Sequence, residues 1–331
     1  MRREECTVEA INLEKTYRNG VKALKGVSFC IQRGEIFSLL GPNGAGKTTT
    51  VKILSTLIKP SGGTAYVGGY NVVDESLKVR KIIGIVPQDL TADDEMTGYD
   101  NVYVQARLHG LPRNEAKKKT EEVLEFMGLL EAANRKTRTY SGGMRKRLEI
   151  AMSLVHSPQI LFLDEPTLGL DVQSRRHLWD LIMKLKREGT TILLTTHYME
   201  EADALSDRIA IIDLGKVVAL GSPGELKARL GGDRIYIKPA FNQDLTSIKE
   251  KLVSKGYEVS ILNGEVIVKV KKAEDSLFDI INLLGDSKIS SLRISKPNLE
   301  DVFLELTGRK LRDEEPLDSF KYRIHSMRVR K

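Results

Sequence analysis

The chain has 331 residues, of which 41% are hydrophobic and 6% aromatic, and its 52 Lys and Arg exceed its 45 Asp and Glu by 7. This length and apolar fraction suffice for a substantial core and for two domains, which excludes disorder and a small disulfide-stapled scaffold. Residues 309–331 hold eight Lys and Arg against four Asp and Glu, and so supply +4 of the net charge. The remainder is nearly balanced and its aromatic residues are sparse, which argues against a dedicated nucleic-acid-binding protein.

Neither a membrane span nor a signal peptide is indicated. No apolar run approaches the roughly 18 residues that a span needs. Residues 1–5 lead into a strand-like segment without an apolar stretch or a cleavage site, so we expect a cytoplasmic location. Cys6 and Cys30 are far apart in sequence and lack CxxC spacing, so we expect reduced, structural thiols rather than a metal or redox pair.

The first two thirds of the chain alternate short apolar strands with amphipathic helices, which predicts an α/β fold with a largely parallel sheet. The clearest buried strands are 36–40, 160–163, 191–195 and 209–212. Strands disappear between residues 89 and 140, where apolar residues at three- and four-residue spacing predict helices at 101–109 and 115–127. We therefore expect an inserted helical subdomain at about 89–140.

Beyond Gly231 and Gly232 the pattern restarts. Strands are predicted at 234–238, 258–262, 265–270 and 291–295, and helices at 245–253, 276–284 and 299–306. This order predicts a small ferredoxin-like α+β domain. We expect a first domain at 1–232, the small domain at 233–308 and a basic tail at 309–331.

A glycine-rich loop follows the strand at 36–40 and reads Gly41-Pro42-Asn43-Gly44-Ala45-Gly46-Lys47-Thr48-Thr49. It matches G-x-x-x-x-G-K-[ST] and leads into a helical segment, so strand, loop and helix occur in the order of a P-loop. The glycines allow backbone N–H groups to surround phosphates at the positive end of the helix. Lys47 would neutralise phosphate charge, and the Thr48 hydroxyl would bind Mg²⁺ through a hard oxygen.

The apolar strand at 160–163 ends in two carboxylates, Asp164 and Glu165. Ligands bind at the carboxyl edge of a doubly wound sheet. Asp164 is therefore suited to hold hydrated Mg²⁺, and Glu165 to accept a proton from water that attacks a γ-phosphate. The alternative is a solvated strand end before the turn residue Pro166.

Further segments complete a pattern: Gln88 after a strand at 82–86, Ser141-Gly142-Gly143-Met144 before a helix, and His197 after Leu193-Leu-Thr-Thr. With Tyr17 ahead of the P-loop and Asp171 after the carboxylates, they make residues 7 to about 230 resemble an ATP-binding-cassette (ABC) ATPase. The resemblance implies a P-loop NTPase that binds ATP and Mg²⁺ and works as a head-to-tail homodimer or pseudo-symmetric pair. Each nucleotide would lie between the P-loop of one chain and the signature, Ser141 to Met144, of the other.

The resemblance also assigns roles, each with a simpler alternative. Tyr17 would stack on adenine, or be an ordinary core aromatic. Ser141, with the N–H groups of Gly142 and Gly143, would bind the γ-phosphate, or merely begin a helix.

Two more residues would sense the γ-phosphate. Gln88, in the Q-loop, would bind Mg²⁺ or water, or be a polar turn residue. His197 would donate a hydrogen bond, or be an ordinary helix-start histidine. The signature has Tyr140 and Met144 where Leu and Gln are commonest, and the D-loop reads Leu168-Gly-Leu-Asp171 instead of Ser-Ala-Leu-Asp. These departures affect the packing around the phosphate-binding atoms.

The ending at 297–308, Pro-Asn-Leu-Glu-Asp-Val-Phe-Leu-Glu-Leu-Thr-Gly, resembles drug-exporting ABC ATPases of the daunorubicin-resistance type, as do residues 62–70 and 197–203. This implies an exporter of drugs, lipids or other hydrophobic compounds, with the chain peripheral on the inner face of the membrane. A separate permease would dock between Gln88 and about Gly110. The small domain would regulate or steady the dimer.

Alternatives remain for the tail and for the whole chain. The basic tail would be a solvated extension, or would contact anionic lipid or a permease loop. The chain could also be a cytosolic ABC ATPase without a membrane partner. A nucleotide-regulated binding module that barely hydrolyses ATP is disfavoured by the intact Glu165 and His197.

Overall fold

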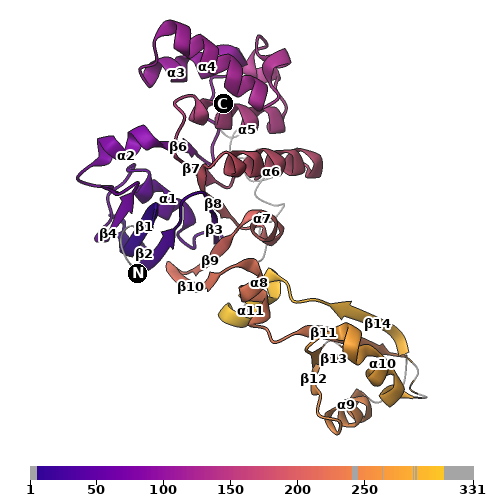
Figure 1. The fold of residues 1–331 in the computed structure, drawn as a ribbon. Coiled ribbons are helices and arrows are strands. Elements are labelled where there is room, and N and C mark those ends of the chain that lie inside the picture. Colours follow the sequence, from indigo (N-terminus) through magenta and orange to yellow (C-terminus); the bar gives the residue numbers. More distant parts are fainter. Residues whose placement is uncertain (1–5, 241–244, 263, 286, 288, 309–331) are drawn as a thin grey trace, which may run out of the picture.

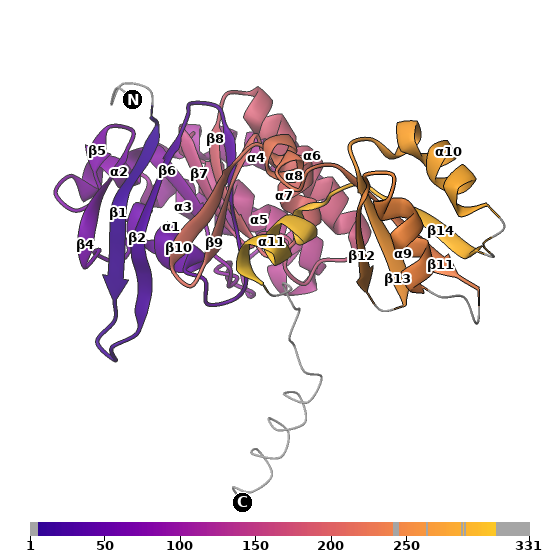
Figure 2. The ribbon, with the colours of Figure 1, turned by 90° about the horizontal axis from the view of Figure 1, so that it is seen from below.

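The computed structural model describes residues 6–240, 245–262, 264–285, 287 and 289–308. Two sheets form the larger part of the molecule, and a third sheet forms a small part that stands away from it (Figures 1 and 2). The expected basic tail at 309–331 lies outside the described residues. Among the described residues, no helix combines the length and apolar character that crossing a membrane requires.

A six-stranded sheet in the order β10-β9-β3-β8-β7-β6 forms the centre of the larger part. Its strands are β3 (Ile36–Leu40), β6 (Ile83–Val86), β7 (Ile160–Asp164), β8 (Thr191–Thr196), β9 (Arg208–Asp213) and β10 (Lys216–Gly221). All neighbours run parallel except β10, which is antiparallel to β9. Parallel strands are covered on both faces and so read as continuous apolar runs. The four strands predicted as buried lie within β3, β7, β8 and β9.

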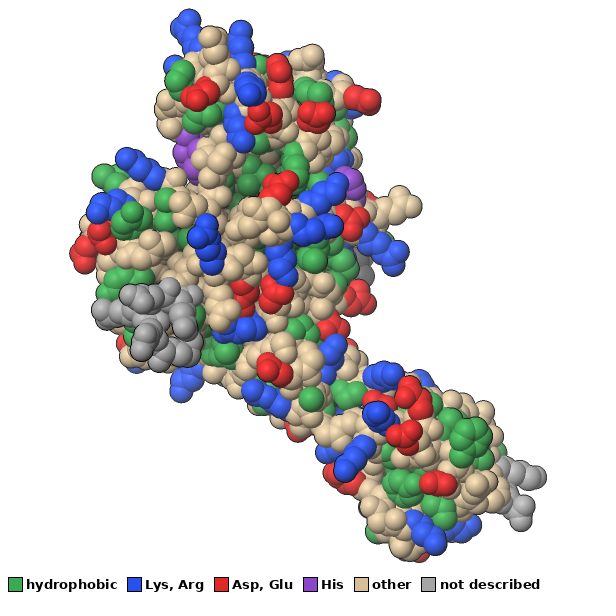
Figure 3. Space-filling model, in the orientation of Figure 1, with side chains coloured by type: hydrophobic (Ala, Val, Ile, Leu, Met, Phe, Trp, Pro, Cys, Tyr) green, Lys and Arg blue, Asp and Glu red, His purple; other side chains and the backbone are tan. Residues whose placement is uncertain are grey.

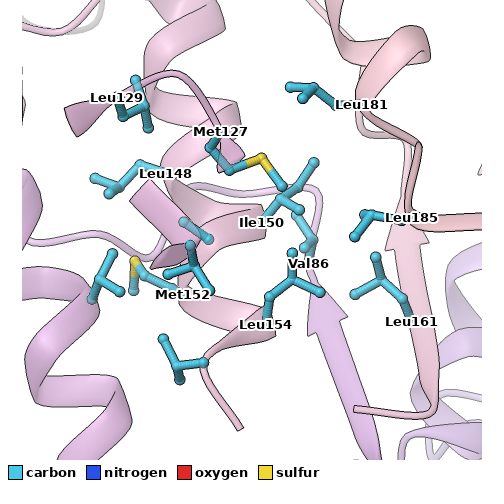
Figure 4. Close-up of a cluster of buried hydrophobic side chains, with 14 of the residues drawn as sticks. Val86, Met127, Leu129, Leu148, Ile150, Met152, Leu154, Leu161, Leu181 and Leu185 are labelled. Atoms are coloured by element: carbon cyan, nitrogen blue, oxygen red, sulfur yellow. The ribbon is translucent and has the colours of Figure 1, made fainter. Parts of the chain in front are cut away.

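Successive side chains of these strands point to opposite faces and divide the core in two. On one face, Leu161 and Leu163 pack with α5 (Gly142–Leu154) and α6 (Val172–Arg187). On the other, Phe162 packs with α1 (Lys47–Leu54) and the second sheet. Figure 4 shows the first cluster, in which side chains of both helices meet those of β6 and β7.

The second sheet is antiparallel and has the order β2-β1-β4-β5. It consists of β1 (Val8–Thr16), β2 (Lys22–Ile31), β4 (Gly62–Val67) and β5 (Tyr70–Asn71). The sequence predicted a largely parallel sheet and did not predict this second, antiparallel one. Only one face of β1 and β2 is buried, so polar residues interrupt their apolar pattern and weaken the strand signal.

The expectation that Cys6 and Cys30 are reduced thiols was wrong. Cys6 and Cys30 form a disulfide, with their Cα atoms 5.5 Å apart. Val8 pairs with Ile31 and Glu9 with Cys30, so the antiparallel ladder brings the segment before β1 next to the end of β2. Separation along the sequence was therefore a poor guide to separation in space.

The predicted helical insertion lies between β6 and β7 and forms a lobe at the top of Figure 1. Its helices are α3 (Gly98–Leu108) and α4 (Arg113–Phe126), with short 3-10 turns at Leu130–Ala132 and Thr137–Thr139, and α5 follows directly after it. The side chain of Thr97 caps α3 and that of Ser141 caps α5. Because the inner half of α5 is buried in the core, this helix ties the lobe to the central sheet.

Three shorter helices complete the larger part: α2 (Ser76–Ile82), α7 (Met199–Leu205) and α8 (Pro223–Ala228). The small part contains β11 (Asp233–Pro239), α9 (Leu245–Val253), β12 (Glu258–Leu262), β13 (Glu265–Val270), α10 (Ala273–Leu284) and β14 (Ile289–Ser295). Its strands are antiparallel in the order β12-β13-β11-β14. This is the ferredoxin-like arrangement that the sequence predicted.

The last described helix, α11 (Leu299–Thr307), returns to the larger part. Its Leu299, Val302 and Phe303 are buried with Leu226 and with β9. A capping box of Asn298 and Asp301 fixes its start. The small domain is therefore followed by a helix that packs on the larger part of the molecule rather than on the small sheet.

Candidate functional site

The P-loop connects the carboxyl end of β3 to α1, and its geometry needs glycine at two positions. A Cβ on Gly41 would lie 2.2 Å from the Ile212 carbonyl oxygen. Gly46 has a φ of 110°, and a Cβ there would lie 2.8 Å from the Ala23 carbonyl oxygen. Since α1 begins at Lys47, the unpaired N–H groups of its first turn follow directly from this loop.

The P-loop forms a wall of an open pocket with a volume of about 410 Å³. The lining residues come from β2 and the segment before it, the P-loop, α1, the Q-loop and the end of β7: Val21, Lys22, Ala23, Asn43, Gly44, Gly46, Lys47, Thr48, Thr49, Gln88 and Glu165. Tyr17 lies beside this pocket, with its hydroxyl 3.2 Å from Thr49 Oγ1. The structure thus brings the P-loop, Gln88 and Glu165 together, with Tyr17 next to them.

Glu165 lies between two potential cations, and all three side chains are largely buried. Its Oε1 is 3.1 Å from Lys47 Nζ and its Oε2 is 3.3 Å from His197 Nδ1. Burial alone would raise the pKa of Glu165, but hydrogen bonding and charge from His197 and Lys47 outweigh it and hold the pKa below its usual value. The carboxylate is therefore ionised at neutral pH, with its backbone in the left-handed region at a φ of 48°.

Asp164 lies deeper at the same strand end. Its Oδ1 accepts hydrogen bonds from the hydroxyls of Thr48, at 3.1 Å, and of Thr195. Thr195 also fixes the next residue, because its carbonyl and hydroxyl oxygens both accept the Glu165 N–H. The two carboxylates and the Thr48 hydroxyl form a group of hard oxygens beside the P-loop.

The sequence did not single out Thr195. Asp164 of β7 is directly paired with Thr195 of β8, and this register is not readable from either segment alone. The available signal was that this strand, Thr-Ile-Leu-Leu-Thr-Thr, ends in two threonines after an apolar run.

The signature and D-loop candidates lie outside the residues that line this pocket, but they contact each other. Ser141, an exposed N-cap, accepts the Met144 N–H. A Cβ on Gly143 would lie 2.7 Å from Ser174 Oγ, and that hydroxyl donates to Asp171 at 2.6 Å. Asp171 caps α6, and hydrogen bonds from Ser174 lower its pKa. A Cβ on Gly142 would lie 3.7 Å from Leu170 of the D-loop.

A P-loop, a strand that ends in two carboxylates, and a helical insertion that ends at Ser-Gly-Gly define the class of ABC ATPases. Comparison with known proteins agrees. The family described as "ABC transporter" matches residues 24–168, and that described as "ATP-binding protein DrrA1-3-like, C-terminal domain" matches residues 221–307.

Named relatives span most of the chain. It is 41% identical to the linearmycin resistance ATP-binding protein LnrL of Bacillus subtilis (strain 168), over 92% of this chain and 100% of the relative. It is 42% identical to the doxorubicin resistance ATP-binding protein DrrA of Mycobacterium tuberculosis (strain ATCC 25618 / H37Rv), over 93% of this chain and 95% of the relative.

Solved structures match the nucleotide-binding part. CbiO1 of Clostridium perfringens, from the ABC transporter complex cbiONQ, gives a TM-score of 0.63 at 31% identity, over 68% of this chain and 92% of that one. The dimeric ATP-binding cassette MJ0796, bound to ADP and Pi, gives a TM-score of 0.60 at 31% identity. The match covers 65% of this chain and 98% of that one. The chain therefore belongs to the ABC transporter family as one of its ATP-binding proteins, and it is an ATPase.

Proposed function

We propose that this ATPase powers an exporter whose membrane permease is a separate chain, and that the cargo is a drug, a lipid or another hydrophobic compound. The names of the relatives, which are resistance proteins for linearmycin and doxorubicin, support this class of cargo. In this role the chain works at the inner face of the membrane. The observation that carries the mechanism is the position of Glu165 between Lys47 and His197.

Glu165 is the general base in this mechanism. Lys47 donates to the carbonyl oxygens of Gly41 and Pro42, at 2.7 and 3.2 Å, as well as contacting Glu165. When ATP binds, Lys47 moves to the phosphate oxygens and the carboxylate becomes free to orient water. Glu165 then takes a proton from the water as its oxygen attacks the γ-phosphorus and ADP leaves. His197 donates a hydrogen bond to the γ-phosphate.

The residues at the strand end fit a magnesium ion. Thr48 Oγ1 and Asp164 Oδ1 are 3.1 Å apart, and Gln88 lines the same pocket. All three offer oxygen donors of the type that Mg²⁺ prefers, and they would hold it together with the phosphates. Bound Mg²⁺ supplies positive charge that neutralises the phosphate oxygens. Tyr17 stacks on the adenine ring from beside the pocket.

A second copy of the chain completes each nucleotide site. Ser141, Gly142 and Gly143 form a positive helix end that does not line the pocket of their own chain. In a head-to-tail dimer they bind the γ-phosphate held by the partner's P-loop, and Asp171 lies beside them at the interface. The dimeric state of MJ0796 supports the formation of a dimer.

The permease docks in a groove between the helical insertion and the part of the core that carries α1 and α2. Figure 3 shows the surface hollowed between these two lobes. The groove has a volume of about 600 Å³, and Pro87, Thr91, Gln105 and His109 line its side nearest the insertion. Because the Q-loop borders both this groove and the nucleotide pocket, a docked permease segment would respond to the nucleotide.

We also assign a supporting role to residues 233–308, which steady or regulate the dimer. The return of α11 to the nucleotide-binding part supports a mechanical connection between the two.

A photo-crosslinking residue at Gln105, expressed in native membranes, tests the docking site. We expect it to capture a membrane protein with several spans, and a probe at Lys118, which is 80% exposed on α4, to capture none. Capture of such a protein from Lys118 but not from Gln105 would contradict the assignment.

A further inference from the structure

Helix α5 presents two charged side chains, Lys146 and Glu149, that are 4% and 3% exposed. They are three residues apart and so lie on the same side of the helix. Charged groups are rarely buried to this extent unless they are paired or hydrogen-bonded. The partners of both lie in one short segment, residues 87–92, which begins at the Q-loop.

Lys146 binds the start of this segment. Its Nζ donates to the carbonyl oxygens of Pro87, at 3.0 Å, and of Gln88, at 3.3 Å. Burial lowers the pKa of Lys146, while the negative charges of Glu149, Asp164 and Asp89 act in the opposite direction.

Glu149 binds the end of the segment. Its Oε1 accepts the N–H groups of Thr91 and Ala92, at 2.6 and 2.7 Å, and its Oε2 accepts the Thr91 hydroxyl at 2.6 Å. Thus the cation takes backbone carbonyls and the anion takes backbone N–H groups. Such charge-assisted bonds are stronger than neutral ones.

The same helix begins at the signature. Ser141 caps α5, and Lys146 and Glu149 follow within its first eight residues, about 12 Å along a rigid helix. A displacement of the signature end of α5 therefore reaches the segment that holds Gln88. Gln88 lines the nucleotide pocket of the same chain, whereas Ser141 does not.

We infer that Lys146 and Glu149 act as a clamp that links the signature to the Q-loop. When the signature of a chain binds the nucleotide held by the partner, the clamp would shift the Q-loop that contacts the chain's own nucleotide. This inference rests on the proposed composite site. Both are positioning residues, which act through Gln88 and Ser141. A purely structural role would stabilise the fold without linking these two movements.

Amide hydrogen exchange in the full chain provides the test, with Glu165→Gln as the parent so that Mg·ATP persists. We call the dimer effect the fold-change in the amide exchange rates of residues 88–92 between this parent and the same chain with Ser141→Arg, both with Mg·ATP; Pro87 has no amide hydrogen. Since both bind nucleotide in their own pocket, the difference reports engagement of the signature. In the parent we expect the exchange rates of this segment to change about 10-fold or more on dimer formation. A change of this size is what the loss of one charge-assisted hydrogen bond would give.

Clamp-breaking variants are Lys146→Met and Glu149→Ala, and conservative ones are Lys146→Gln and Glu149→Gln, which keep a donor or an acceptor. Arg145→Gln is the matched control, because Arg145 also lies on α5 but pairs with Asp94, outside the segment, at 2.9 Å. We expect the dimer effect to fall below about 2-fold in the first pair and to persist in the other three.

Sedimentation of the same samples separates the two proposals. A dimer that forms in Lys146→Met and Glu149→Ala with an undiminished dimer effect would overturn the clamp and leave the composite site standing. A parent that binds Mg·ATP without forming a dimer would overturn the composite site, and the clamp with it. If one breaking variant fails to fold, the other decides, since each removes a separate end of the clamp.

Discussion

Lys47 and Glu165 form a buried ion pair, with Nζ 3.1 Å from Oε1, and this pair joins the phosphate-binding loop to the carboxylate strand. In the mechanism that we propose, the lysine binds the phosphates and the carboxylate activates water, so each group would be held by the other until nucleotide separates them.

We expect Glu165→Gln to lower kcat about 10²- to 10⁴-fold, because the amide keeps the shape but cannot accept the proton of water. ATP binding should be retained or tightened, since Lys47 loses a competing partner. Steady-state phosphate release and calorimetric titration measure the two effects. Glu188→Gln, at the end of α6, is the control and should hydrolyse ATP at the wild-type rate. Wild-type turnover in Glu165→Gln would remove this residue from the mechanism.

Lys47→Ala should weaken ATP binding about 10-fold or more, because it deletes a charge that contacts the phosphates in the ground state. Lys52→Ala provides the comparison, as Lys52 lies exposed in the last turn of the same helix. Calorimetry with a non-hydrolysed ATP analogue reports both affinities. If the two variants bind equally well, Lys47 does not contact phosphate.

The composite site predicts that Glu165→Gln sediments as a dimer with Mg·ATP and as a monomer without it. Adding Ser141→Arg should abolish the shift, because the larger, charged side chain blocks the helix end that receives the γ-phosphate. Ser222→Arg, which also replaces a serine helix N-cap, should leave the dimer intact. An ATP-dependent dimer that survives Ser141→Arg would refute this geometry.

Glu201 should make stability depend on pH. Its side chain is fully buried and accepts a hydrogen bond from Trp179 Nε1 at 3.0 Å, and burial raises its pKa above 4.5 despite hydrogen bonding from Thr196, Thr167 and Trp179. The native state therefore holds the proton more tightly than the unfolded state. Its contribution to the free energy of unfolding is present below pH 4.5 and is lost as pH rises through the native pKa.

Glu201→Gln stays neutral, so its stability relative to the wild type should increase as the pH rises above 4.5. Urea unfolding at several pH values gives this difference, with the exposed neighbour in Glu200→Gln as the control. A difference that is constant from pH 4 to 8 would show that the two states of Glu201 bind the proton equally.

Phe303→Ala should lower the free energy of unfolding by about 3–5 kcal/mol, since it leaves a cavity where α11 meets α8 and β9. Phe303 is 1% exposed, whereas the adjacent Leu304 is 36% exposed, so Leu304→Ala should cost much less. Denaturant unfolding compares the two. Equal costs would mean that α11 is only loosely attached.

Candidate site residues could be predicted from the sequence where they are adjacent in the chain. Each of two segments, Gly41 to Thr49 and Asp164-Glu165, is positioned by the end of a single strand. The sequence pattern of each segment was therefore enough to predict where it lies in the fold. Contacts that depend on register or on tertiary packing were not readable. Thr195 reaches Asp164 only because β7 and β8 are paired, and Cys6 reaches Cys30 only through the β1–β2 ladder.

The side chains of α5 illustrate the same limit. Lys146 and Glu149 read as ordinary polar positions of an amphipathic helix, and only the packing of segment 87–92 against that helix buries them. The signature residues were recognisable from sequence, and the resemblance implied that they serve the nucleotide of the other chain; in the structure they lie outside the residues that line the pocket of their own chain.

Because α11 packs back on the larger part, two chain segments connect that part to the small domain. The chain enters it after α8 and leaves it into α11, and these two helices pack together through Leu226 and Phe303, while Arg234 at the entrance lies 3.3 Å from Asp301 at the exit. A single linker rotates freely about its bonds, but two segments fastened side by side resist that rotation and transmit torque. The small domain is thus held to the nucleotide-binding part by two segments, so free rotation about a single linker is not open to it.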